Sequence, residues 1–62
     1  MNRLPTFEDT RRDAYRLLGD TQDVLRSDWA EGTGPNPKQS DALQRALRAI
    51  TEAKNALNEA AN

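Results

Sequence analysis

A short cluster of glycine and proline divides this chain into two segments of nearly equal length. The cluster consists of Gly32, Gly34, Pro35 and Pro37. Proline cannot continue a helix, and glycine favours the left-handed backbone conformation at which helices end, so no single helix crosses this region. On both sides of it, apolar residues recur with a helical period. The sequence therefore predicts a helix over residues 6–31, a turn over 32–36 and a second helix over 37–61.

Each predicted helix begins with a capping signal. Asn36 can cap the second helix, the following proline suits the first helical position, and Gln39 can reach back to the cap. Thr6 and Asp9 form the same kind of pair before the first helix. Helices of similar length joined by a short turn pack antiparallel. We therefore expect an all-α fold, a single domain over residues 1–62 that forms an antiparallel helical hairpin.

Apolar residues recur three or four positions apart along both segments, as in coiled coils. The second segment contains an alanine seam, defined as Ala42, Ala46, Ala49, Ala53, Ala56 and Ala60. One position further on runs a leucine seam, defined as Leu43, Leu47, Ile50, Lys54, Leu57 and Ala61. The first segment contains one stripe, formed by Phe7, Arg11, Ala14, Leu18, Thr21 and Leu25. Two adjacent seams indicate a helix with two neighbours; the alternative is that alanine is present only as the best helix former.

The chain has few large side chains with which to build a core. Only 35% of its 62 residues are hydrophobic, and nine of these are alanine. Chains this short often need a disulfide, a metal or a partner, and this one has neither cysteine nor histidine. We therefore expect two hairpins to dimerise into a four-helix bundle; the alternative is a hairpin completed by a different protein. Such a dimer resembles the Rop type of RNA-binding bundle in architecture only, since the chain contains no matching motif.

The predicted interface, with a second copy or another partner, combines seam residues with one aromatic side chain near the turn. It comprises Phe7, Arg11, Ala14, Leu18, Leu25, Trp29, Leu43, Leu47, Ile50, Lys54 and Leu57. Trp29 is expected at the end of the first helix, where it either closes the bundle or is an exposed anchor for a partner. Thr21 is expected to bond back to its own helix.

Two residues of this interface, Arg11 and Lys54, are charged although the seams call for apolar side chains. In one interpretation their stems lie along the apolar surface while their charges reach water. In the other they orient a dimer whose turns lie at opposite ends, because they then face Asp28 and Glu31 of the second copy. The sequence leaves both interpretations open.

The composition argues against catalysis and metal binding. Without cysteine or histidine the chain lacks a thiol nucleophile, the usual base near neutral pH and the usual zinc ligands. The carboxylates alternate with arginine, which disfavours raised pKa values, and no phosphate-binding loop is present. We therefore expect no enzyme activity, no catalytic residue, no metal site and no cofactor.

The leading functional prediction is a non-enzymatic protein-interaction module or regulator that presents helical faces as a homodimer. A net charge of −1 gives no general attraction to nucleic acid or membrane. Arg45 and Arg48 nevertheless form a modest basic stripe on the second helix, so RNA or DNA binding through them is one alternative. A structural subunit is another. No targeting signal or membrane-spanning segment is seen, so a cytoplasmic location is expected.

Overall fold

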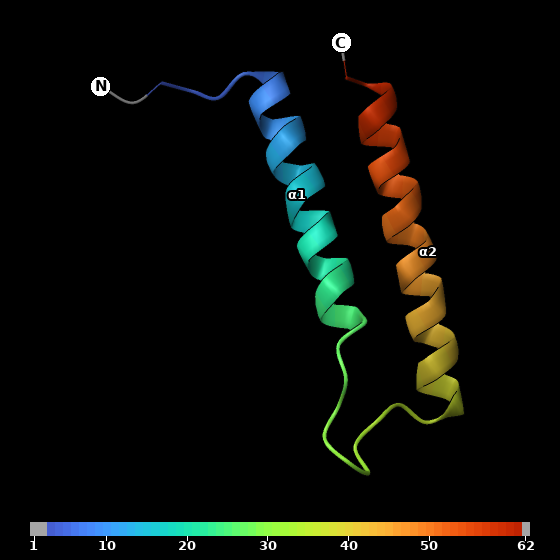
Figure 1. Cartoon of the computed structure of the whole chain (residues 1–62). Helices are drawn as coiled ribbons and strands as arrows, with labels where there is room; N and C mark the ends of the chain where they lie inside the picture. The colour runs from blue at the N-terminus through green and yellow to red at the C-terminus, as the bar shows by residue number, and fades with distance from the viewer. Residues whose placement is uncertain (1–2, 62) are drawn as a thin grey trace.

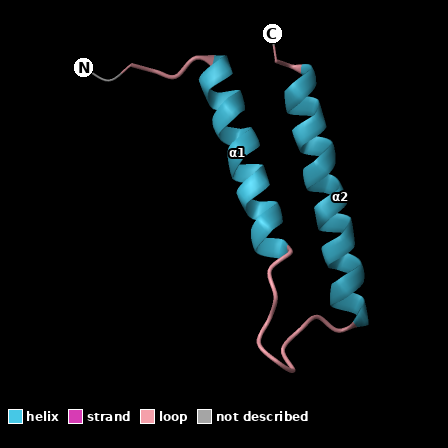
Figure 2. Cartoon of the chain, in the orientation of Figure 1, coloured by secondary structure: helices cyan, strands magenta, loops and turns pink. Residues whose placement is uncertain are grey.

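The structure is a hairpin of two antiparallel helices (Figure 1). This computed structural model describes residues 3–61, in which α1 spans Phe7–Leu25, α2 spans Pro37–Glu59 and no strand occurs. Figure 2 shows a long loop joining the helices at one end, here called the turn end. The start of α1 and the end of α2 lie together at the other end, here called the open end. The predicted all-α hairpin is confirmed.

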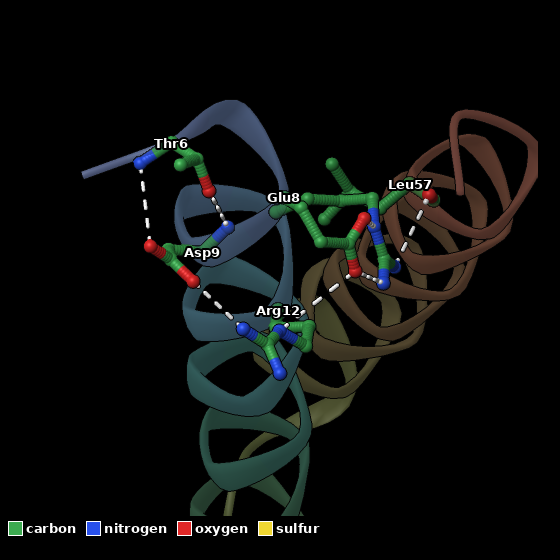
Figure 3. A network of polar contacts seen from close by, with 6 residues as sticks. Thr6, Glu8, Asp9, Arg12 and Leu57 are labelled. Atoms are coloured by element: carbon green, nitrogen blue, oxygen red, sulfur yellow. Dashed lines mark hydrogen bonds and ion pairs between the residues drawn. The ribbon is translucent and has the colours of Figure 1, made fainter. Parts of the chain in front are cut away.

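Both helices begin with the predicted capping pairs. The Thr6 hydroxyl accepts a hydrogen bond of 3.1 Å from the Asp9 amide, and the Asp9 carboxylate accepts one of 3.3 Å from the Thr6 amide. Asn36 and Gln39 form the same reciprocal pair, with bonds of 2.7 and 3.0 Å. These bonds satisfy amides that have no partner within the helix, so they fix where each helix begins. The Thr6–Asp9 pair is visible in Figure 3.

The end of the first helix was predicted wrongly, because α1 stops at Leu25 and not at residue 31. The Arg26 amide shares its hydrogen between the carbonyls of Gln22 and Asp23, at 3.0 and 3.2 Å. The Ser27 hydroxyl then donates to the Asp23 carbonyl at 3.0 Å. The same bond from a hydroxyl to the carbonyl four residues earlier occurs inside both helices, at Thr21 and Thr51, so it accompanies the end of α1 without causing it. The loop therefore covers residues 26–36, and α2 ends at Glu59, two residues before the predicted position.

Gly32 has the expected left-handed backbone but a different role. Its φ is 79°, and the Thr33 amide donates a 3.0 Å hydrogen bond to the Ala30 carbonyl. A positive φ at the third position of such a four-residue turn defines a type II β-turn, which requires glycine there. Gly32 therefore shapes a turn inside the loop and does not terminate α1.

The interface between the helices leaves the hairpin without a closed core. No apolar side chain in residues 3–61 is buried, and Gln22 is the one residue of that range classed as buried, with 7% of its surface exposed. The large apolar residues that face the other helix, such as Leu18 and Ile50, are only half-buried. Phe7, Leu17, Val24 and Trp29 are exposed and therefore stay open to contact with another molecule.

Candidate interaction surfaces

The leucine seam of α2 is the surface that faces α1. All six of its residues are half-buried. On α1, four members of the predicted stripe are half-buried as well: Arg11, Ala14, Leu18 and Leu25. Phe7 and Thr21 are exposed instead, whereas Tyr15 and Gln22 lie in the contact face. α1 is thus rotated slightly relative to the prediction.

A polar cluster occupies the middle of this contact. The Gln22 amide nitrogen donates to the Thr51 hydroxyl at 3.1 Å, and the Lys54 ammonium donates to the Gln22 oxygen at 3.0 Å. The same ammonium lies 4.9 Å from the centre of the Tyr15 ring, within the range of a cation–π contact. Gly19 lies beside this ammonium, and a β-carbon there would be at an ordinary contact distance of 3.9 Å from the Lys54 nitrogen. Gln22 was not predicted to take part in any contact.

Lys54 therefore already has partners within its own chain. Its half-buried side chain points to Gln22 and Tyr15 across the hairpin. The role of Lys54 in orienting a dimer stays a prediction, but the ammonium on which that role depends is held by α1. Arg11, the other charged residue of the predicted interface, also has partners within its own chain.

Arg11 links the start of α1 to the end of α2; Figure 3 shows two of its partners, Glu8 and Leu57. Only 10% of its side chain is exposed; its Nε donates to Glu8 at 2.9 Å and its Nη1 to the Leu57 carbonyl at 3.5 Å. Carbonyls in the last turn of a helix lack partners and carry the negative end of the helix dipole. α2 has no basic residue in its own last turn. Arg11 therefore places a positive charge beside this helix end, where it is favourable.

The two acidic residues at the open end, Glu8 and Asp9, pair with arginine: Glu8 with Arg11 and Arg12, and Asp9 with Arg12. The hydrogen bond from Arg11 is the main cause that lowers the pKa of Glu8 below its ordinary value of 4.5. The hydrogen bond from the Thr6 amide, followed by that from Arg12, lowers the pKa of Asp9.

Within residues 3–61, no group of three acidic, histidine or cysteine side chains is placed to hold a metal ion.

The second seam of each helix lies on one common face of the hairpin, here called the apolar face. The alanine seam of α2 precedes the leucine seam by one residue, and on α1 Leu17 and Val24 precede the contact residues Leu18 and Leu25 by one residue. Successive residues of a helix point about 100° apart. Because the two helices run in opposite directions, the residue before each contact residue points to the same side of the hairpin in both. Leu17 is 59% and Val24 69% exposed. Of the alanine seam, only Ala53 is half-buried.

A pocket of about 440 Å³ lies at the turn end of this face, here called the tryptophan pocket. Its lining comes from α1, the loop and α2: Val24, Leu25, Trp29, Thr33, Pro35, Gln39 and Leu43. Trp29 belongs to the loop and not to the helix end where it was predicted, and its side chain is 51% exposed. The pocket therefore has an apolar wall that the hairpin itself does not fill.

The opposite face of the hairpin is polar and carries one of the two predicted nucleic-acid contacts, Arg48. A groove on it is lined by Arg26, Gln44, Leu47, Arg48 and Thr51. Arg45 pairs with Asp41 at 3.2 Å, whereas Arg26 and Arg48 form no ion pair within the part of the chain that the structure describes. The structure thus brings Arg48 next to Arg26, a pairing that the sequence did not indicate, and leaves Arg45 with an acidic neighbour.

Comparison with known proteins adds no relative from which a site could be transferred. No protein-family description, no curated protein and no solved structure matches this chain. Neither helix of residues 3–61 has the length and apolar character needed to cross a membrane.

Proposed function

We propose that this protein is a non-enzymatic protein-interaction module whose apolar face binds a second copy of the chain to form a four-helix bundle. The observation that carries this proposal is that the hairpin buries none of its apolar side chains in residues 3–61 while Leu17 and Val24 stand exposed on one face. Covering a leucine or valine completely contributes about 1.5–3 kcal/mol, so exposed side chains of this kind favour association.

The alanine seam supports a second helix pair as the occupant of this face. Its small side chains allow two helices to approach closely, and its regular spacing is that of helix-on-helix packing. Covering the apolar face leaves the polar face in solvent. The dimer would then present that polar face, with its arginine side chains, to other molecules.

Sedimentation equilibrium and circular dichroism on the same dilution series test this proposal. We expect a dimer whose helicity falls on dilution, because each hairpin completes the core of the other. Ala49→Glu places a charge on the apolar face and should weaken dimerisation at least about tenfold. Gln44→Glu adds the same charge to the opposite face and should change it by less than about twofold. A monomer at every concentration, or equal effects of the two variants, would contradict the proposal.

A second candidate function is supported by the groove on the polar face. Arg26 and Arg48 lie there without acidic partners in the described residues, beside the hydrogen-bonding groups of Gln44 and Thr51. Guanidinium groups in such a setting can bind the phosphates of RNA or DNA. If they do, affinity falls steeply with salt, and Arg48→Gln lowers it much more than Arg16→Gln, which removes the same charge elsewhere. Equal effects of these variants would exclude this groove as the binding site.

A further inference from the structure

We infer that, in the dimer proposed above, the turn end of each hairpin lies beside the open end of the other, and that Phe7 of each chain fills the tryptophan pocket of the other. This inference rests on the proposed homodimer and specifies its geometry. It joins two features that one hairpin leaves unused: an exposed aromatic side chain and an open pocket with an apolar wall.

Phe7 cannot reach the pocket of its own chain. It is the first residue of α1 and is 66% exposed at the open end, whereas the pocket lies at the turn end. Phe7 and Val24 are 17 positions apart in α1, which corresponds to about 25 Å along the helix axis. Any contact between Phe7 and the tryptophan pocket must therefore join two copies of the chain.

Phe7 and the pocket nevertheless lie on the same side of the hairpin. Phe7 precedes the contact residue Arg11 by four positions, which turns it by about 40° toward the apolar face. Val24, which lines the pocket, belongs to that face. A two-fold symmetric interface buries the same patch on both chains. If Phe7 of one chain enters the tryptophan pocket of the second, Phe7 of the second chain therefore enters the pocket of the first.

The alanine seam sets the alignment of the two copies. When two α2 helices pack antiparallel through this seam, alanine meets alanine at every step: Ala42 with Ala60, Ala46 with Ala56 and Ala49 with Ala53 of the second copy. The two-fold axis then passes Thr51. The contacts of Tyr15 with Lys54 and of Gln22 with Thr51 place residues 18–22 of α1 level with Thr51.

This alignment brings Phe7 to the tryptophan pocket. Phe7 lies 11 to 15 positions before these residues, so the symmetry places it past the end of α1 of the second copy, beside the loop that contains Trp29. On α2 of the second copy the same level falls between Asn36 and Ser40, next to Gln39 of the pocket lining. Phe7 thus lies at the turn end of the second copy, where the tryptophan pocket is.

The opposite orientation, with both turns at the same end, lacks these contacts. It would place each pocket beside the other pocket and leave Phe7 against the alanine end of α2. It would also bring the acidic residues Asp28 and Glu31 of the two loops together, at a cost from like-charge repulsion. In the inferred orientation, the exposed Arg3 of one chain approaches those acids of the other.

Spin labels test the orientation. The chain has no cysteine, so Lys38→Cys provides a unique label on an exposed site at the turn end. The inferred dimer places the two labels about 40 Å apart along the helix axes. The other orientation brings them to about 20 Å or less, two interhelical spacings. A single short distance would overturn the inference while leaving the proposed dimer intact.

A double-mutant cycle tests the contact itself, with dimer dissociation constants from sedimentation. Phe7→Ala and Trp29→Ala truncate side chains that are exposed in the single hairpin, and each should weaken dimerisation about tenfold. If Phe7 fills the pocket, the double variant is weakened by far less than about a hundredfold. Leu17→Ala combined with Trp29→Ala is the control and should be multiplicative. Multiplicative effects of Phe7 and Trp29 would overturn the pocket contact alone, whereas a wild-type chain that never dimerises would overturn both proposals.

Discussion

The ammonium group of Lys54 on α2 and the side-chain oxygen of Gln22 on α1 are joined by a hydrogen bond of 3.0 Å. This bond lies in the middle of an otherwise largely aliphatic contact between the helices. A polar pair in such a position fixes the register and rotation of two helices, because sliding or turning either helix leaves a polar group unpaired. The Gln22–Thr51 bond of 3.1 Å restricts the same movement.

Gln22→Leu should lower the free energy of unfolding by about 1–2 kcal/mol, because it removes the acceptor of a charged hydrogen bond. Adding Lys54→Leu should recover that loss, since an apolar pair of similar size can replace a polar one. Urea unfolding at one fixed chain concentration measures both effects. Gln44→Leu on the polar face is the matched control and should have little effect. A double variant less stable than the single variant would contradict the assignment.

The pKa of Glu8 should be raised by Arg11→Gln, because the hydrogen bond from Arg11 is the main cause that lowers it. A carboxyl whose pKa is lower in the folded chain stabilises the fold above its unfolded pKa, and this contribution is lost as pH falls through the folded value. The wild type should therefore lose stability as the pH falls below about 4.5. Over the same pH range, the Arg11→Gln variant should lose less stability than the wild type. Titration of the carboxyl carbons by NMR and melting at several pH values measure both effects. Arg48→Gln, which does not touch Glu8, should leave its pKa unchanged.

Asn36→Ala should destabilise the protein by about 1 kcal/mol, because it removes the side-chain cap of α2. The capping oxygen of Asn36 lies 2.7 Å from the Gln39 amide nitrogen. Asn55→Ala makes the same change at an exposed position inside the helix and should be neutral or slightly stabilising. Thermal unfolding followed by circular dichroism compares the two variants. Equal destabilisation would show that the cap has no special role.

Two glycine substitutions should have opposite effects on stability. Gly32→Ala should cost about 1 kcal/mol, since the φ of 79° at this position disfavours any side chain. Gly19→Ala should stabilise by about 0.5–1 kcal/mol, because alanine is the better helix former. Its β-carbon would meet only the end of Lys54, at an ordinary contact distance of 3.9 Å. Denaturant unfolding of the two variants should shift the midpoint in opposite directions; a loss of stability in Gly19→Ala would indicate that Lys54 has no room to adjust.

Local chemistry in the sequence determined the hairpin. The capping pairs at Thr6 and Asn36 and the prolines between the helices act within a few residues, so they can be recognised without knowledge of the tertiary contacts. The leucine seam of α2 was recognised for the same reason: its spacing holds over the whole helix. The end of α1 was missed because no glycine or proline lies between Leu25 and Gly32, so the sequence carries no strong stop signal where the helix ends.

Only the tertiary structure decided which side of α1 faces α2. The residues Arg11, Tyr15, Leu18, Gln22 and Leu25 follow the same spacing of four and three as the predicted stripe, so periodicity could not separate the two. The choice depends on Lys54, whose half-buried charge needs an acceptor, and Gln22 provides one when α1 is turned toward it. The same rotation leaves Phe7 exposed and directs Leu17 and Val24 to the apolar face. A sequence specifies such a rotation only through contacts between distant residues, here Gln22 and Lys54.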